Sequence, residues 1–319
     1  MNTVMKPDAL PIVVIGAGPA GLAAAAHLLA RDLEPLVLEA GLAAAHSVRQ
    51  WGHVRMFTPW RYCVDRAAAG LLASHGWTHP PADDVPTGAE LVRDYLDPLA
   101  AYLGSKVRVG ARVTAVTRKG ADKVRTAGRA DLPFVLRVSD PQGRIRVIEA
   151  AAVIDASGTW TAPNPAGSDG LPALGETEAV EHIAYGIPNV LGEARGRYAY
   201  RRVAVLGSGH SALNVLIDLA ALRMEAPGTH IHWLMRKDHV ESAFGGEAAD
   251  ALPARGALGS DTRNLVESGA VDVTAPFRVK AIERGAAGSL VIEGEQGGEP
   301  KHLEVDELIV ATGFRPDLS

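Results

Sequence analysis

The chain has 319 residues, 47% of them hydrophobic and 22% charged, which is typical of a soluble globular protein large enough for two domains. Its formal net charge of −5 argues against general nucleic-acid binding and offers no basic surface to a membrane. The single cysteine, Cys63, excludes an internal disulfide and a Cys-x-x-Cys dithiol and fits a reducing compartment. The uncharged stretch 10–30 contains the glycines and proline of a turn, and no signal peptide is evident. We therefore expect a cytoplasmic protein without a transmembrane helix.

Near the amino end, a short apolar run leads into the glycine-rich turn Gly16–Gly21 and then into an alanine-rich stretch with helical spacing. This is the strand–turn–helix opening of a dinucleotide-binding unit. We expect Gly16 to permit the tight turn, Gly18 to let the backbone approach a pyrophosphate, and Gly21 to let the helix pack close to the strand. The next predicted strand ends in Glu39, whose carboxylate suits a ribose 2′-OH. The alternative interpretation is an ordinary strand–helix turn followed by a chance acid.

A second apolar run leads into a second turn, Gly207–Ala212, and another helix-prone stretch. Ala212 stands at the third glycine position, which such units tolerate. The following strand, expected over 230–237, ends in Arg236 and Lys237 where the first ended in an acid. A cation there suits a ribose 2′-phosphate, so this unit is predicted to prefer NADP(H) to NAD(H). The alternative is that both are solvated charges at a strand end.

Other patterns predict the elements around these turns. We expect a helix over 21–30, and a capping box in which Thr87 and Glu90 begin a helix that ends near residue 103. The segments 43–86 and 243–260 are predicted to be irregular, and 161–196, with several prolines and glycines, to connect two domains. Further helices are predicted from the second turn to about residue 223 and over 262–268. Strands are predicted at 12–15, 36–39, 106–116, 134–138, 144–148, 152–155, 203–206, 271–274, 279–282, 290–292 and 308–311.

The order of these motifs resembles that of flavoproteins with two dinucleotide-binding domains, and flavin-containing monooxygenases more than thioredoxin reductases. The residues that carry the resemblance are the first turn with Glu39, Asp155-Ala156-Ser157-Gly158, the second turn, Arg236, and Ala311-Thr312-Gly313-Phe314-Arg315-Pro316-Asp317. The resemblance implies an α/β fold of two Rossmann-like three-layer domains, with the NADPH domain inserted in the FAD domain. The implied division is 1–165 for the first FAD segment, 166–200 for a connection, 201–305 for the NADPH domain, and 306–319 for the start of a return to the FAD domain.

The resemblance also implies the cofactor-binding residues. FAD would be held by Gly16, Gly18, Pro19, Ala20, Gly21 and Glu39, and NADPH by Gly207, Gly209, His210, Ser211 and Arg236. Gly158 and Gly313 would mark the crossovers between the domains.

The chain departs from the family pattern at three places. It has no dithiol, so dithiol reduction is excluded. The Phe-x-Gly-x-x-x-His stretch of Baeyer–Villiger and related monooxygenases is not clear before Gly207, where Glu181-His182-Ile183 lies. The family adds a closing strand near the flavin after the second Ala-Thr-Gly motif, whereas this sequence stops at Ser319. We expect either a fragment with an exposed flavin ring or an FAD site completed in another way.

The predicted reaction is hydride transfer from NADPH to FAD, with monooxygenase-like use of the electrons. Arg49 and Trp51 are the candidates for flavin contact, unless Trp51 is core and Arg49 a surface charge. His53 and Thr58 are weaker catalytic candidates, and the catalytic group is otherwise unknown. The hydrolase pattern Gly-x-Ser-x-Gly fails at 209–213. No metal site is expected. Gly76 and Pro80 interrupt a helix at His75 and His79, and His230 and His232 share a strand face with no third ligand in sight.

The expected partners are a small-molecule substrate, with dioxygen as a candidate acceptor, and neither nucleic acid nor membrane; a homodimer is left open. Two alternative functions remain. One is an electron-transfer flavoreductase that passes electrons to a protein partner. The other is an incomplete nucleotide-binding module without activity.

Overall fold

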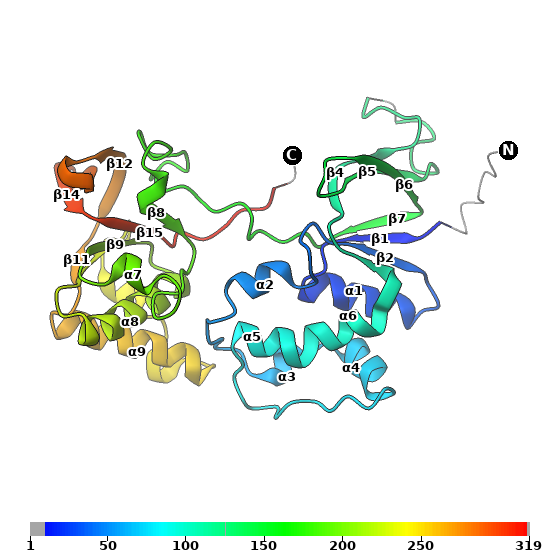
Figure 1. The fold of residues 1–319 in the computed structure, drawn as a ribbon, viewed down its shortest axis with the longest axis horizontal. Coiled ribbons are helices and arrows are strands. Elements are labelled where there is room, and N and C mark those ends of the chain that lie inside the picture. Colours follow the sequence, from blue (N-terminus) through cyan, green and yellow to red (C-terminus); the bar gives the residue numbers. More distant parts are fainter. Residues whose placement is uncertain (1–9, 125, 318–319) are drawn as a thin grey trace. The chain divides into compact units, whose positions relative to one another are not determined.

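The computed structural model describes residues 10–124 and 126–317, which form two compact units. Unit 1 contains the chain up to Gly52 together with Pro59–Gly158, and unit 2 contains His53–Thr58 together with the chain from Thr159. Each unit has a central parallel sheet with helices on one face and a three-stranded antiparallel meander on the other (Figure 1). The predicted α/β class with two Rossmann-like three-layer domains is therefore confirmed.

In unit 1 the parallel sheet has the strand order β3-β2-β1-β7. The first predicted strand forms β1, which pairs in parallel with both β2 and β7. Its valine and isoleucine side chains suit a pleated, buried surface. The strands are β1 (Ile12–Ile15), β2 (Pro35–Leu38), β3 (Val107–Arg108) and β7 (Ala152–Asp155), and those of the meander are β4 (Arg112–Arg118), β5 (Phe134–Ser139) and β6 (Ile145–Ala150).

The helices of unit 1 follow the two signals that the sequence predicts. Helix α1 follows the first glycine turn and buries Leu22 and Ala25 completely. The capping box is confirmed: the Glu90 N–H donates to Thr87 Oγ1 at 3.1 Å, and the Thr87 N–H donates to Glu90 Oε2 at 2.7 Å. The helices are α1 (Pro19–Leu29), α2 (His46–Gln50), α3 (Trp60–Cys63), α4 (Arg66–Ala73), α5 (Gly88–Leu91), the π-helical η2 (Val92–Leu96), α6 (Asp97–Leu103) and the 3-10 turn η3 (Gly104–Lys106).

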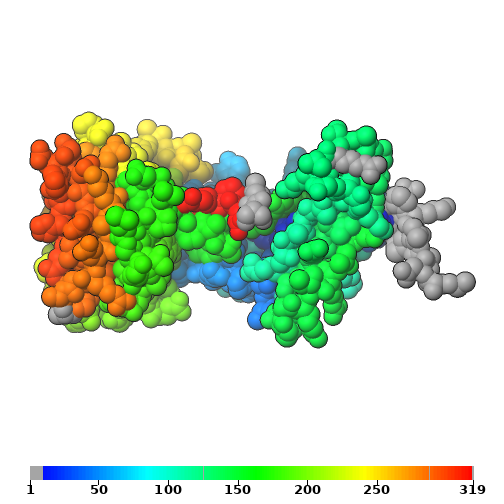
Figure 2. All heavy atoms as spheres, turned by 90° about the horizontal axis from the view of Figure 1, so that it is seen from above, coloured from blue at the N-terminus to red at the C-terminus, as the bar shows by residue number. Residues whose placement is uncertain are grey.

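The meander of unit 1 covers the face of the sheet opposite α1. Leu136 and Val138 of β5 are buried against Val13 and Leu38 of the parallel sheet. Removing apolar surface from water in this way stabilises the fold by roughly 25 cal/mol per Å². The other side of the meander forms part of the surface (Figure 2). Val147 of β6 is 65% exposed.

Two expectations for unit 1 are wrong. The segment 43–86 is not irregular, because it contains α2, α3 and α4. Helix α4 has its own cap, since the Asp65 carboxylate accepts two N–H groups of its first turn at 2.9 and 3.0 Å. The run 106–116 is two strands in different sheets, because Gly110, with a φ of +61°, turns the chain between β3 and β4.

In unit 2 the parallel sheet has the order β11-β10-β9-β15-β8. Leu216 and Leu219 of α8 are fully buried against Val205 and Trp233 of this sheet. The strands are β8 (Ile183–Tyr185), β9 (Arg202–Leu206), β10 (His230–Leu234), β11 (Asp272–Thr274) and β15 (Glu307–Val310), with the meander β12 (Phe277–Arg284), β13 (Leu290–Gln296) and β14 (Glu299–Val305). The helices are α7 (Arg195–Tyr198), α8 (His210–Glu225) and α9 (Pro253–Glu267), with the 3-10 turns η4 (Val180–His182), η5 (Val240–Ala243), η6 (Glu247–Ala249) and η7 (Ala286–Gly288).

The sequence predicts unit 2 less accurately. The stretch 161–196, expected to be a connection, supplies strand β8 to the sheet of this unit. Helix α9 occupies part of the expected loop 243–260 and extends the expected helix 262–268 toward the amino end. Strand β10 ends at Leu234, earlier than the predicted 230–237, and β14 was not predicted.

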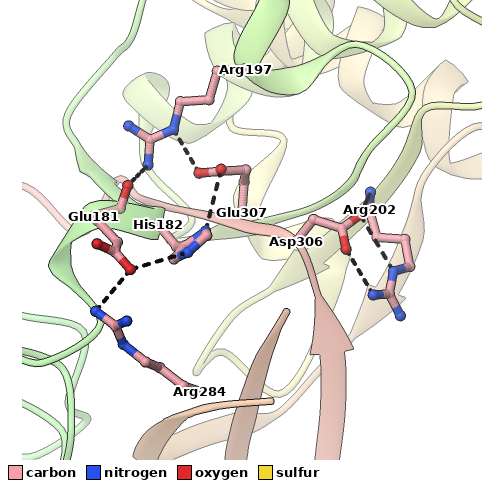
Figure 3. A network of polar contacts seen from close by, with 7 residues as sticks. All are labelled: Glu181, His182, Arg197, Arg202, Arg284, Asp306 and Glu307. Atoms are coloured by element: carbon pink, nitrogen blue, oxygen red, sulfur yellow. Dashed lines mark hydrogen bonds and ion pairs between the residues drawn. The ribbon is translucent and has the colours of Figure 1, made fainter. Parts of the chain in front are cut away.

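A charged network lies at the amino ends of the parallel strands of unit 2 (Figure 3). Arg202 begins β9, and its Nη2 lies 2.8 Å from Asp306 Oδ1. Glu307 begins β15, accepts a hydrogen bond from Arg197 Nε at 2.6 Å, and lies 3.6 Å from His182 Nδ1. Burial raises the Glu307 pKa, against the opposing effect of these two neighbours. Because open parallel sheets bind ligands at the carboxyl ends of their strands, we infer a structural role for this network.

The carboxyl group of Asp218 on helix α8 has no hydrogen bond or ion pair within the described residues. Burial raises its pKa from 3.8 to about 6. The native state therefore binds this proton more tightly than the unfolded chain, and the stability contributed by the proton is lost as the pH rises from about 4 to about 6.

We expect Asp218→Asn to stabilise the protein at pH 8, because the variant removes a desolvated charge. The shift corresponds to at most about 3 kcal/mol, and partial exposure to solvent reduces the expected gain to about 1–2 kcal/mol. Thermal unfolding of both proteins should show a difference in stability that narrows as the pH falls toward 4. Asp261→Asn, on exposed helix surface, is the matched control and should change stability by less than about 0.5 kcal/mol at either pH. An equal difference in stability between native protein and Asp218→Asn at pH 8 and pH 4 would contradict the raised pKa of Asp218.

Candidate nucleotide-binding sites

The first glycine turn has the geometry that its three glycines predict. Gly16 has a φ of +96°, and a Cβ there would lie 2.5 Å from the carbonyl oxygen of Ala156 at the end of β7. A Cβ on Gly21 would lie 1.9 Å from the Gly16 carbonyl oxygen, so the close packing of helix on turn requires glycine. Gly18 differs, because a Cβ there would have no neighbour within 4 Å. The space beside Gly18 is therefore open for a ligand.

Glu39, directly after β2, is part of the same turn. Its Oε2 accepts the Ala17 N–H at 2.8 Å, and its Oε1 accepts the Gly41 N–H at 2.7 Å. These bonds fix the carboxylate beside the turn. Each carboxylate oxygen can accept a second hydrogen bond, so the group retains capacity for a ribose hydroxyl.

Arg49 and Trp51, the predicted flavin contacts, lie at the end of α2 in unit 1. The Arg49 Nε donates to the Ala44 carbonyl at 3.0 Å, and its Nη2 pairs with Asp97. The ring of Trp51 lies so close to Gly88 that a Cβ there would be 2.7 Å from it. Both side chains are thus held by other parts of unit 1, and flavin contact by either stays a prediction.

The second glycine turn repeats the first in unit 2. Gly207 has a φ of +137°, and a Cβ there would lie 2.3 Å from the Ala311 carbonyl oxygen at the end of β15. Gly209, like Gly18, has no atom within 4 Å of an added Cβ. Ala212 is fully buried under the sheet. The Gly207 carbonyl accepts the Trp233 Nε1–H at 2.7 Å, which ties the turn to β10.

Both turns lead into helices that lack a side-chain cap in the described part of the chain. Within the described residues no side chain caps α1 or α8, whereas Asp65 and Thr87 cap α4 and α5. Uncapped N–H groups and the positive end of the helix dipole form an anion-binding site. Gly18 and Gly209 are the N-cap residues, so the open space lies where a phosphate would meet these groups.

The ends of the second strands differ between the two units. Ile15 pairs with Leu38 and Leu206 pairs with Leu234, so Met235 is the counterpart of Glu39. The exposed Arg236 follows, and its Nη1 donates to the Ser168 carbonyl at 3.0 Å. Lys237 Nζ donates to the Ser242 carbonyl at 2.7 Å. In the part of the chain that the structure describes, neither cation has an acidic partner.

The segment 53–58, which the chain inserts between α2 and α3, belongs to unit 2. His53 Nε2 is buried and has no hydrogen-bond partner among the described residues. Burial lowers the His53 pKa, against the opposing effect of Glu193 and the carbonyls of 187–188. Thr58 ends the segment. The segment also contains Phe57, which the sequence did not predict as a site residue. Its ring centroid lies 4.8 Å from that of His210.

Gly158 and Gly313 end the two Ala-Ser/Thr-Gly motifs, with φ angles of +74° and +87°. In unit 2, Thr312 Oγ1 donates to the Asn164 carbonyl at 3.2 Å, and Asn164 Nδ2 donates to the Thr312 carbonyl at 3.0 Å. The second motif is thus paired with the chain that follows the first.

Two other kinds of site are not found within residues 10–124 and 126–317. No group of three or more His, Cys, Asp or Glu side chains could hold a metal ion there. No helix in these ranges has the length and apolar character needed to cross a membrane.

The structure brings the predicted residues together in two groups, one in each unit. The first turn gathers Gly16, Gly18, Pro19, Ala20, Gly21 and Glu39, and the second gathers Gly207, Gly209, His210 and Ser211, with Arg236 beyond the end of β10. The sequence missed Phe57, Asp250 and Arg255 beside the second turn, because no local pattern marks contacts so distant along the chain.

The sequence profile of the pyridine nucleotide-disulphide oxidoreductase family matches residues 13–319, and the chain belongs to this family. No curated protein matches the chain in sequence. The family and the solved structures below confirm the predicted resemblance to flavoproteins with two dinucleotide-binding domains.

Three similar structures illustrate the range of the fold, and each is covered to a similar extent. The bacillithiol disulfide reductase Bdr (YpdA) of Bacillus cereus has a TM-score of 0.73 at 19% identity, over 97% of this chain and 79% of that one. The FAD-bound cadaverine monooxygenase DfoA of Erwinia amylovora has a TM-score of 0.70 at 17% identity, over 97% of this chain and 79% of that one. The L-lysine 6-monooxygenase of Pseudomonas syringae has a TM-score of 0.63 at 19% identity, over 97% of this chain and 82% of that one. At these identities the likeness defines the fold.

Proposed function

We propose that the chain is an FAD oxidoreductase that takes hydride from NADPH and uses it in a monooxygenase reaction on a small molecule. The observation that carries the proposal is the repetition of one turn geometry. Both units have a positive-φ glycine against a neighbouring strand end, followed by an N-cap glycine with open space beside it. Two such sites in one chain accommodate two dinucleotides, as electron transfer between them requires.

The residues present fit one dinucleotide in each unit. In unit 1, a Cβ at Gly18 would fill the space where a pyrophosphate meets helix α1, and Glu39 suits the ribose hydroxyls of FAD. In unit 2, Gly209 offers the same space, and the charges of Arg236 and Lys237 suit the 2′-phosphate of NADPH. Bound FAD would supply a two-electron hydride acceptor, and the protein positions the two nucleotides.

The chemistry of Cys63 favours the monooxygenase branch over disulfide reduction. Burial raises the pKa of its thiol, and Sγ donates to the Pro59 carbonyl at 3.4 Å. A protonated thiol is a poor nucleophile, and the chain has no second cysteine for a dithiol. The similar structures of a cadaverine monooxygenase and an L-lysine 6-monooxygenase support this choice, because enzymes named as monooxygenases share the fold.

The proposal is tested by mixing the FAD-reconstituted protein with NADPH or NADH without oxygen and following the visible absorbance of the flavin. Faster bleaching by NADPH is expected. Readmission of oxygen with candidate amines should then give product, with oxygen and NADPH consumed in equal amounts. Rapid cytochrome c reduction without substrate-linked oxygen use would instead identify an electron-transfer flavoreductase, and failure to bind FAD would overturn the proposal.

A further inference from the structure

An aromatic pair stands at the beginning of helix α8 in unit 2. His210 is the first residue of the helix and directly follows Gly209. Its ring is tilted by 44° against the ring of Phe57, with the centroids 4.8 Å apart. His210 is nevertheless exposed to solvent, and the space beside Gly209 is open. A ligand at the helix terminus would therefore lie beside an imidazole that Phe57 covers on one side.

Two charged side chains act on this imidazole. Arg255 of α9 pairs with Asp250, with Nη2 2.8 Å from Oδ1, and Asp250 also accepts the Leu252 N–H at 2.8 Å. Partial burial lowers the His210 pKa most, Arg255 lowers it further, and Asp250 opposes them. Among the described residues, no other titratable group shifts the pKa of this imidazole. The neutral form of the ring is therefore favoured in the free protein.

We propose that His210 takes up one proton from solvent when a dinucleotide pyrophosphate binds at the amino end of α8, and that Phe57 keeps the ring neutral until then. The inference rests on the proposed function, because it assigns this helix terminus to the second nucleotide. It adds a coupling between nucleotide affinity and pH to that site.

The physical reason is the charge that the ligand brings. A pyrophosphate carries negative charge to the first N–H groups of α8, within reach of the neighbouring side chain. An opposite charge at such a distance favours the imidazolium form, whose two ring N–H groups both donate. The pKa of His210 is then higher in the complex than in the free protein. Affinity consequently rises as the pH falls between those two pKa values, by at most about tenfold per pH unit for one proton.

The first turn supplies an internal contrast. The residue that corresponds to His210 in α1 is Pro19, which has no ionisable group. The two turns share the geometry of their first two glycines, Gly16 with Gly207 and Gly18 with Gly209. Proton uptake is therefore expected at the second turn and not at the first.

The test is titration calorimetry with ADP-ribose, which contains the pyrophosphate but lacks the 2′-phosphate, whose own second pKa of about 6 would obscure the result. Measurements between about pH 6 and pH 8, where histidine titrates, use two buffers of different ionisation enthalpy. Native protein should bind more tightly at lower pH and take up protons on binding. His210→Asn and His210→Gln should bind with little pH dependence and no proton uptake.

Two further variants separate this role from a general effect on the fold. His230→Asn, an exposed histidine at the amino end of β10, should retain the native pH dependence. Phe57→Ala should reduce proton uptake, because a more solvated His210 is already partly protonated in the free protein. The chemical shifts of His210 in histidine-labelled protein should follow the same changes. Binding without pH dependence, or equal dependence in His210→Asn, would overturn this inference alone, whereas no ADP-ribose binding at any pH would overturn the proposed function as well.

Discussion

Replacing Gly18 with valine should give a folded protein that no longer retains FAD. Gly18 has φ −79° and ψ −175°, an extended backbone that β-branched residues adopt readily. The side chain meets no protein atom within 4 Å of its Cβ, so the fold accommodates it. In the proposed complex, however, valine occupies the path of the pyrophosphate beside α1. We expect FAD affinity to fall by about 100-fold or more, equivalent to about 2.8 kcal/mol.

The measurement is the ratio of flavin to protein absorbance after dialysis, together with circular dichroism to verify folding. Gly209→Val is the matched control, because Gly209 has the same extended backbone and the same open space at the second turn. It should retain FAD and lose pyridine-nucleotide binding. Gly21→Ala should instead impair folding, since its Cβ would meet the Gly16 carbonyl at 1.9 Å. Stoichiometric FAD in Gly18→Val would refute the placement of the flavin nucleotide in unit 1.

The two glycine turns were predictable because their constraints are local. A positive φ and a contact too close for any Cβ restrict Gly16 and Gly207 to glycine, so the sequence records the geometry directly. The capping box at Thr87 is equally local, since all its atoms lie within four residues.

The amino-terminal part of helix α9 was not predictable because tertiary packing outweighs its intrinsic preferences. Gly256 and Gly259 disfavour an isolated helix by roughly 1 kcal/mol each. In the structure, their lack of side chains lets the backbone of 244–247 pack against the helix, with Cβ positions only 2.0 and 1.8 Å from the carbonyls of Glu247 and Phe244. Glycine therefore marks close packing here, although the sequence alone favours a loop.

The residues of the candidate sites also differ in whether a local sequence pattern predicts them. The glycines, Glu39 and Arg236 belong to two recognisable strand–turn–helix units, and the sequence places each near its turn. The segment 53–58 has no such signature, and its contact with His210 joins residues more than 150 positions apart in the sequence. Contacts of that kind depend on how the whole of unit 2 folds, which no local pattern encodes.

Arg236→Ala should weaken NADPH binding much more than NADH binding. The guanidinium is exposed, bonds only the Ser168 carbonyl, and has no acidic partner in the described chain, so its charge is available to a ligand. A hydrogen bond to a charged group contributes roughly 1.5–3 kcal/mol, which corresponds to about a 10- to 150-fold change in affinity. NADH lacks the 2′-phosphate, so its affinity should change by less than about threefold.

The role of Arg236 is tested by measuring the dissociation constants of NADP⁺ and NAD⁺ side by side for native protein and variant. Lys237→Ala is the matched control on the neighbouring cation, and we expect a smaller loss because an ammonium cannot bind phosphate in the bidentate manner of arginine. Arg236→Lys should recover part of the NADP⁺ affinity through charge alone. Met235, which replaces the acid found at Glu39 of the first unit, removes the group that would repel a 2′-phosphate. Equal losses for both nucleotides, or a native preference for NAD⁺, would show that the cations after β10 are solvated charges without a role in recognition.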